Sequence, residues 1–163
     1  VKTDNFAIYV SNIAKHKGHI DILKIANQLP VDKVVIVGSI SDEDGKKIYK
    51  KLVNNKKFIL LQNVETNDLI KLVDNANLVL FPSYYEGYGI PIGEAIIRNK
   101  KVYANQELKK YITNCNLISF IDFRNGANIK GIKNKSDDKC ECGSCEWKLK
   151  WRDRAKKMSE LYF

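Results

Sequence analysis

The sequence predicts an α/β fold in which helices cover both faces of a parallel sheet. Strand-like and helix-like segments alternate along the 163 residues, as they do when a crossover helix follows each strand. The strand-like segments are also apolar almost throughout, which is typical of parallel strands that are buried on both faces. Because such crossovers are right-handed, we expect a doubly wound, Rossmann-like domain.

Apolar segments rich in β-branched residues or leucine are the expected strands. They span 6–11, 33–39, 58–64, 77–83 and 101–105, with a weaker sixth at 118–122. Helices are expected between them, because apolar residues recur there at helical spacing. These helices span 18–29, 41–53, 66–76 and 90–99. The acidic run Asp42–Asp44 opens the second helix, and Thr66 or Asn67 is the expected N-cap of the third.

The sequence changes character after Arg124. Residues 124–146 are mostly polar, and we expect an irregular loop there. Residues 147–162 then follow a helical pattern. The stripe that would form the packed face of this helix consists of Trp147, Trp151, Ala155, Met158 and Leu161. Because no internal repeat or proline-rich linker divides the chain, we expect residues 1–163 to form a single domain.

The net charge of +9 favours anionic partners such as nucleic acid, phosphorylated ligands or an acidic membrane surface. The lysines are scattered over the faces of the expected helices, and no recognition-helix pattern or RNA-binding aromatic motif accompanies them. We therefore expect no nucleic-acid partner. No apolar run approaches the roughly 20 residues that a membrane-spanning helix needs.

Three of the four cysteines, Cys140, Cys142 and Cys145, lie in the segment CECGSC, whereas Cys115 stands apart. Zinc binding is one interpretation, with Cys115 as a distant fourth ligand. The spacing C-x-C-x-x-C lacks the second C-x-x-C pair of many zinc sites, and both histidines are far away in the sequence. We therefore favour a reduced polar loop and expect no metal.

The segment FPSYYEGYGIPIGEA, residues 81–95, follows an expected strand and precedes an expected helix. In an open parallel sheet, ligands bind at the carboxyl ends of the strands, so this connection lies on the ligand-binding edge. Pro91 and Glu94 both suit a first helical turn, where the N–H groups are unpaired and the helix dipole favours an acid. Gly87 and Gly89 would let backbone and ligand approach closely.

Two other connections on the same edge carry residues that suit an anion. Lys17 and Gly18 follow the first expected strand, and Gly38 lies at the end of the second. Together with the amides of residues 88–90 at the helix start, a lysine and a glycine could hold a diphosphate. The simpler alternative makes the glycines turn residues and Glu86 a solvated surface acid.

The segment also resembles the E-x7-E motif of retaining glycosyltransferases of the GT-B fold, family 4. The matching positions are Pro82, Ser83, Glu86, Gly87, Gly89, Pro91, Glu94 and Ala95. Segments at 9–26, 34–39, 60–83 and 151–162 resemble further parts of the family in the same order. The resemblance therefore covers nearly the whole chain.

This resemblance implies one half of a GT-B fold, the domain that binds a nucleotide-sugar donor. The N-terminal, acceptor-binding domain is absent from the sequence, which begins with valine, so we expect an excised domain that is inactive alone. The implied reaction transfers a hexosyl group, mannosyl or glucosyl, to a glycan or lipid-linked acceptor with retention. The donor would be a nucleotide sugar such as GDP-mannose or UDP-glucose, with no further cofactor and no metal.

The functional residues of the family carry over position by position. Lys17 would contact the donor diphosphate, Glu94 the ribose hydroxyls and Glu86 the transferred sugar, which makes Glu86 and Lys17 the expected catalytic residues. Further donor contacts are expected from Gly38, Val64, Gly87, Tyr88, Gly89 and Ile90. Because members often act on lipid-linked acceptors, the lysine-rich surface suggests a cytoplasmic protein that associates with an anionic membrane face.

The sequence departs from the family pattern at two places. Many members carry an arginine where Asn12 stands, and here Asn12, Lys15 or His16 would supply that phosphate contact. The glycine that usually follows the motif helix is replaced around Asn99 and Lys100.

Three alternative functions remain at this stage. One is another enzyme of the same fold, a nucleotide-sugar epimerase or a phosphorylase-like enzyme, although the E-x7-E match argues against the first and no pyridoxal lysine stands out for the second. Another is a nucleotide-binding module without catalysis. The last is a metal–diphosphate site of GT-A type at Asp42–Asp44, a run that we interpret as a helix start.

Overall fold

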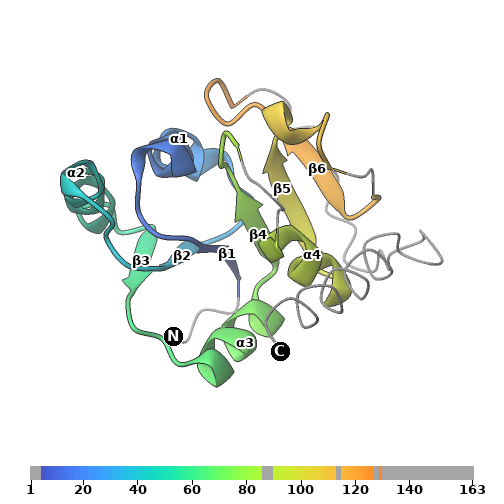
Figure 1. The fold of residues 1–163 in the computed structure, drawn as a ribbon, viewed down its shortest axis with the longest axis horizontal. Helices are drawn as coiled ribbons and strands as arrows, with labels where there is room; N and C mark the ends of the chain where they lie inside the picture. The colour runs from blue at the N-terminus through green and yellow to red at the C-terminus, as the bar shows by residue number, and fades with distance from the viewer. Residues whose placement is uncertain (1–4, 86–89, 113–114, 127–128, 130–163) are drawn as a thin grey trace, which may run out of the picture.

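The computed structural model describes residues 5–85, 90–112, 115–126 and 129, which form a six-stranded sheet with flanking helices (Figure 1). The strands are β1 Phe6–Val10, β2 Lys33–Val37, β3 Phe58–Leu61, β4 Leu78–Phe81, β5 Lys101–Asn105 and β6 Ile118–Ile121. The α-helices are α1 His19–Ile25, α2 Glu43–Val53, α3 Thr66–Asn75 and α4 Ile90–Ile97. Short 3-10 helices span Lys15–Lys17, Ala26–Gln28 and Gln106–Leu108.

The strand order is β3-β2-β1-β4-β5-β6, and every neighbouring pair is parallel. The chain builds outward from β1 to β3 in one direction, crosses back through α3, and then builds outward from β4 to β6 in the other. Figure 1 shows α1 and α2 on one face of the sheet and α3 and α4 on the other. The predicted doubly wound α/β fold is therefore confirmed, and the weakest expected strand is present as β6.

Burial explains why the central strands are apolar along their whole length. All of β4 is buried, as are the first four residues of β1 and the last four of β2. Helices cover both faces of these strands, so no position alternates toward solvent. Only the first residue of the edge strand β3 is buried, and the other three are half-buried.

Most elements differ from their predicted bounds by one or two residues, and two elements end three or four residues earlier than the sequence predicts. The helix expected to reach residue 29 ends at Ile25 and continues as a 3-10 turn, since Leu29 has the extended backbone that a following Pro30 favours. The strand expected to reach residue 64 ends at Leu61, and Asn63 then adopts a left-handed conformation with φ of 54°.

The starts of α2 and α3 differ in how they are capped. Asp42 precedes α2, and its Oδ1 accepts a hydrogen bond from the Gly45 amide at 2.6 Å, so the acidic run serves as a helix start. Residues 43 and 44 form surface ion pairs with Lys46 and Lys47. Before α3, the N-cap is Glu65, whose side chain makes no capping hydrogen bond, and the prediction of Thr66 or Asn67 is wrong.

The end of α4 keeps its turn without the glycine usual in the resembling family. Asn99 has φ of 55°, the Lys100 amide donates to the Ala95 carbonyl at 2.8 Å, and the Asn99 amide donates to the Ile96 carbonyl at 2.9 Å. These two bonds form a Schellman motif. Asparagine adopts the left-handed conformation more readily than most residues, so it can replace glycine here.

The loop predicted at 124–146 and the helix predicted at 147–162 lie almost wholly outside the described residues, as do Cys140, Cys142 and Cys145. Cys115 is buried in the core. Within the described part of the chain, no helix is both long and apolar enough to cross a membrane. The same residues contain no group of three or more His, Cys, Asp or Glu side chains that could hold a metal ion.

Candidate functional site

The candidate site lies where the strand order reverses, between β1 and β4. The connections that follow these two strands leave in opposite directions and open the sheet edge between them. Lys17 follows β1, and Glu94 lies in α4, which follows β4. Gly38 follows β2 and Val64 follows β3, so these four predicted residues share the carboxyl edge. Because neighbouring strands lie about 4.8 Å apart, this edge spans roughly 14 Å from β3 to β4.

Ile90, the first residue of α4, lies on the same edge. The other predicted donor contacts of the motif, Glu86, Gly87, Tyr88 and Gly89, lie outside the described residues.

The connections after β1 and β4 contact each other directly. The Tyr84 amide donates to the His16 carbonyl oxygen at 3.3 Å, and the rings of His16 and Tyr85 stack with their centroids 6.0 Å apart. Gly18 lies so close to Pro82 that a Cβ on Gly18 would be 2.5 Å from the Pro82 carbonyl oxygen. Gly18 also has φ of 73°, which glycine adopts without steric cost. Gly18 is therefore required for the two connections to meet.

A third connection, after β2, packs against the first. A Cβ on Gly38 would lie 2.1 Å from the Ser11 carbonyl oxygen, and the Ser39 hydroxyl donates to Asn12 Oδ1 at 3.0 Å. Gly38 thus has a packing role that is independent of any ligand. Of the three candidates for a second phosphate contact, Asn12 bonds to Ser39 and His16 stacks on a tyrosine. The exposed Lys15 side chain makes no hydrogen bond or ion pair with another described residue.

An aromatic group beneath the first connection holds the backbone of Lys17. The buried Tyr9 hydroxyl donates to the Lys17 carbonyl oxygen at 2.9 Å. The Tyr9 ring centroid lies 4.9 Å from that of His19 and 6.5 Å from that of Phe81. The backbone at Lys17 is therefore held by a hydrogen bond from a side chain of the buried core.

His19 is fully buried in this group, and neither of its ring nitrogens has a hydrogen-bond partner among the described residues. Burial lowers the pKa of His19 to about 4. The Ala14 backbone opposes this shift in part, and the nearby Lys17 and His16 lower the pKa by smaller amounts. At neutral pH, His19 is therefore an uncharged part of the packing.

The first residues of the motif are fixed from the core. Asn105, buried at the end of β5, donates through Nδ2 to the Pro82 carbonyl oxygen at 3.0 Å. Ser83 is fully buried, and its hydroxyl donates to the Tyr85 carbonyl oxygen at 3.3 Å. These bonds set the direction in which the chain enters the segment between β4 and α4.

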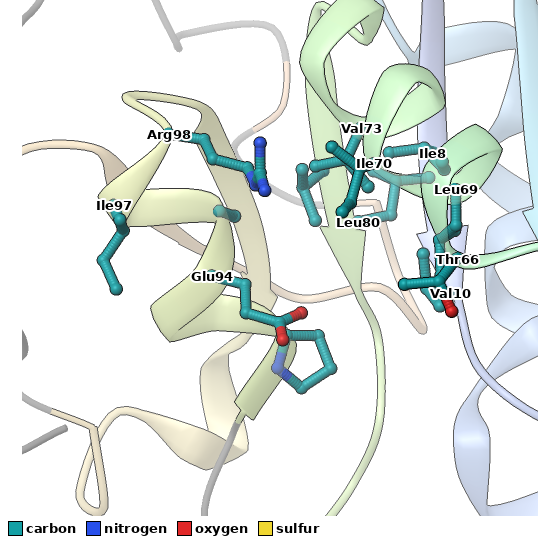
Figure 2. A pocket seen from close by; sticks show the side chains of 13 residues that line it. Ile8, Val10, Thr66, Leu69, Ile70, Val73, Leu80, Glu94, Ile97 and Arg98 are labelled. Atoms are coloured by element: carbon teal, nitrogen blue, oxygen red, sulfur yellow. The ribbon is translucent and has the colours of Figure 1, made fainter. Parts of the chain in front are cut away.

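A cavity of about 560 Å³ lies over the sheet between α3 and α4 (Figure 2). Its apolar lining includes Ile8, Val10, Leu69, Ile70, Val73 and Leu80. Thr66, Pro91 and Glu94 line it at the carboxyl edge, and Figure 2 shows Glu94 projecting from α4 on the side that faces α3. The volume is in the range of small-ligand sites, which are mostly apolar with a few placed polar groups.

The two charged side chains in this cavity differ in their partners. Arg98 Nη1 lies 2.5 Å from Asp74 Oδ1 and links α4 to α3. The exposed Glu94 carboxylate has no hydrogen-bond or ion-pair partner within the described ranges. Glu94 is therefore the acid that a ligand entering from the carboxyl edge would meet.

The sequence did not predict the roles of Asn105 or of a cluster formed by Asp21, Tyr84 and Arg124. One sequence feature could have drawn attention to Asp21. It is an acid in the first turn of α1, next to the apolar Ile22, which is buried. The partners of Asp21 lie in distant parts of the sequence, and no local pattern indicated them.

Comparison with known proteins identifies the family. The family model described as glycosyl transferases group 1 matches residues 1–107. The chain belongs to this family. No curated protein sequence matches this glycosyltransferase domain in a separate comparison.

Solved structures of glycosyltransferases share the fold of this group 1 domain. HepE from Anabaena is similar at 20% identity and a TM-score of 0.62, over 77% of this chain and 38% of that chain. WaaG is similar at 21% identity and a TM-score of 0.60, over 77% and 37% of the two chains. The C-terminal domain of LpcC from Francisella tularensis is similar at 20% identity and a TM-score of 0.54, over 67% and 63%. The chain therefore spans less than half the length of HepE and WaaG.

Proposed function

We propose that this domain binds the nucleotide-sugar donor of a retaining glycosyltransferase. The enzyme would transfer a hexosyl group, glucosyl or mannosyl, to a glycan or lipid-linked acceptor. The observation that carries the proposal is the placement of Glu94, an acid without a partner among the described residues, at the carboxyl-edge end of an apolar cavity. Lys17 follows the neighbouring strand β1 across the switch point.

The nucleoside would lie along the carboxyl edge, with its ribose at Glu94 and its base toward Val64. A carboxylate can accept hydrogen bonds from two vicinal hydroxyl groups, and bonds to an ionised acceptor are stronger than neutral ones. HepE has been solved in complex with UDP and glucose, which makes UDP the first nucleotide to test here.

The diphosphate would lie between Lys17 and the start of α4 at Ile90. Helix N-termini favour anions, and α4 begins at the switch point. When the bond between the anomeric carbon and the diphosphate oxygen breaks, negative charge grows on the diphosphate. Lys17 would stabilise that charge, and Glu86 would face the transferred sugar.

A domain of this size would bind the donor without completing the reaction. Because the chain covers 38% of HepE, the acceptor would be bound by a second domain. The alternative, a nucleotide-binding module without catalysis, predicts the same binding for this chain and differs only when an acceptor domain is supplied.

The surface charge suggests where the enzyme would work. WaaG takes part in lipopolysaccharide biosynthesis, and a lipid-linked acceptor would place this domain at the cytoplasmic face of a membrane. Exposed lysines on α2, among them Lys50 and Lys51, would favour an anionic lipid surface. Vesicle co-sedimentation without preference for anionic lipid would count against this part of the proposal.

The donor site is tested by titrating the full chain with UDP, GDP, ADP and their hexose conjugates, using calorimetry. We expect saturable binding of one nucleotide, and we expect Glu94→Ala and Lys17→Ala each to weaken it about tenfold or more, as for loss of a charged hydrogen bond. The matched controls are Asp32→Ala and Lys50→Ala, an exposed acid before β2 and an exposed base in α2.

The controls should bind like the unmodified chain. Equal losses in the controls would indicate a general charge effect and contradict the assigned site. If none of the nucleotides binds, the proposal that this domain alone forms a donor site is wrong.

A further inference from the structure

Three side chains from distant parts of the sequence form a bonded cluster on the α1 side of the candidate site. Asp21 lies in α1, Tyr84 in the connection after β4, and Arg124 after β6. The Tyr84 hydroxyl donates a short hydrogen bond to Asp21 Oδ2, and Arg124 Nε donates to the Tyr84 oxygen at 3.1 Å. The Arg124 guanidinium carbon lies 4.4 Å from the centroid of the Tyr84 ring. We call these three residues the loop tie.

The carboxylate of Asp21 in the loop tie is paired with a lysine of the same helix. Asp21 is 5% exposed, and Lys24 Nζ lies 2.8 Å from its Oδ1. A buried carboxylate is unfavourable unless it is paired and hydrogen-bonded, so Asp21 holds its partners in place. Burial and the bond to Asp21 raise the pKa of Tyr84, which keeps the hydroxyl protonated as the donor that this geometry requires.

Tyr84 joins the loop tie to the proposed phosphate-binding connection. Its backbone amide donates to His16, the neighbour of Lys17, while its side chain reaches α1. One residue of the motif is thus attached both to the connection after β1 and to the helix that follows that connection.

We propose that Tyr84 is a positioning residue, which through Asp21 and Arg124 holds the connections after β1 and β4 at a fixed separation before the donor binds. This inference rests on the proposed donor site and adds to it residues that touch no donor atom. Groups that are ordered before binding need not be ordered by the ligand, and affinity is greater for that reason.

The loop tie should act on the diphosphate and much less on the nucleoside. A diphosphate would bridge the connections after β1 and β4, and Tyr84 belongs to the second and bonds to the first through its amide and the His16 carbonyl oxygen. Ribose would bind Glu94, which belongs to α4 and lines a cavity that includes none of the three residues. A ligand with one phosphate should therefore depend less on Tyr84 than a ligand with two.

The test compares UDP and UMP binding to the full chain and to Tyr84→Phe, which keeps the ring and removes the hydroxyl. We expect the Kd for UDP to rise about tenfold, as for loss of a hydrogen bond to an ionised group, and the Kd for UMP to rise about twofold or less. Asp21→Asn keeps an acceptor for the Tyr84 hydroxyl, so its affinity for UDP should fall less than that of Asp21→Ala. The control is Tyr111→Phe, since Tyr111 is 69% exposed and remote in sequence from the motif.

Amide hydrogen exchange provides a test without ligand. In Tyr84→Phe, the amide of residue 84, which bonds to the His16 carbonyl, should exchange at least about tenfold faster, because the loop tie no longer holds it. An unchanged exchange rate, or UDP and UMP affinities that fall equally, would overturn the positioning role while leaving the donor site intact. If the unmodified chain binds neither UDP nor UMP, the comparison is made with GDP and GMP and with ADP and AMP. The positioning role fails together with the proposed function when none of these nucleotides binds.

Discussion

Replacing Gly18 by alanine should destabilise the domain through two separate effects. The φ of 73° places the residue in the left-handed region, which costs an alanine about 1 kcal/mol. The added Cβ would also lie 2.5 Å from the Pro82 carbonyl oxygen, which is itself held by Asn105. Forcing a methyl group into such a contact costs about 1–3 kcal/mol, so we expect a total of about 2–4 kcal/mol.

Gly126 separates the two effects. It has a similar φ of 64°, but a Cβ there would meet the terminal amide of Gln28 at 2.8 Å, and that flexible side chain can move away. Gly126→Ala should therefore cost only the conformational effect, about 1 kcal/mol. The difference between the two variants measures how tightly the connection after β1 packs on Pro82.

The assay is urea unfolding followed by circular dichroism at 25 °C, with thermal unfolding as a second measure. For a domain of this size, we expect Tm to fall by about 4–16 °C in Gly18→Ala and about 2–4 °C in Gly126→Ala. Equal losses in both variants would refute the reasoning, because they would mean that Pro82 yields without cost.

Two other predictions concern pH and the end of α4. Because burial lowers the pKa of His19 to about 4, the unfolded chain binds a proton more readily than the folded one below about pH 6.5, and stability should fall by up to about 3 kcal/mol as pH drops to 4. His19→Phe should remove this part of the pH dependence, as measured by the urea midpoint. If the midpoint of the variant changes between pH 7 and 4.5 as much as that of the unmodified chain, the role assigned to His19 is contradicted. Asn99→Gly should keep or slightly raise Tm, whereas Asn99→Val should cost about 1–2 kcal/mol because a β-branched residue resists φ of 55°. Similar Tm values for both Asn99 variants would argue against the left-handed turn.

The strands could be predicted from sequence because burial on both faces leaves a continuous apolar run, as in β4. The ends of elements depend on single residues whose effect is harder to judge. Pro30 limits α1 and the left-handed Asn63 follows β3, whereas Glu65 occupies the N-cap of α3 without a capping bond. Local propensity favoured threonine or asparagine there, and the path of the chain into the helix placed the start one residue earlier.

The residues of the candidate site likewise differ in how well the sequence predicts them. The carboxyl-edge rule placed Lys17 and Glu94 on one side of the sheet from their positions after strands alone. The loop tie has no comparable signal, since Tyr84 is 63 residues from Asp21 and 40 from Arg124 along the chain. Gly18 and Gly38 were expected near the ligand, and the structure gives both a steric reason that concerns neighbouring backbone.

The pairing of β1 with β4 has a consequence for how the protein becomes functional during synthesis. Ala7 pairs with Leu78 and Ile8 with Val79, so β1 stays unpaired along one side until the ribosome has released the segment that forms β4. Contacts between such distant segments form slowly, because a long loop must close first. Lys17 and Glu94 can therefore take their places on the same sheet edge only after this step. A nascent chain stalled before β4 would expose an apolar strand edge, which we expect to require chaperone protection.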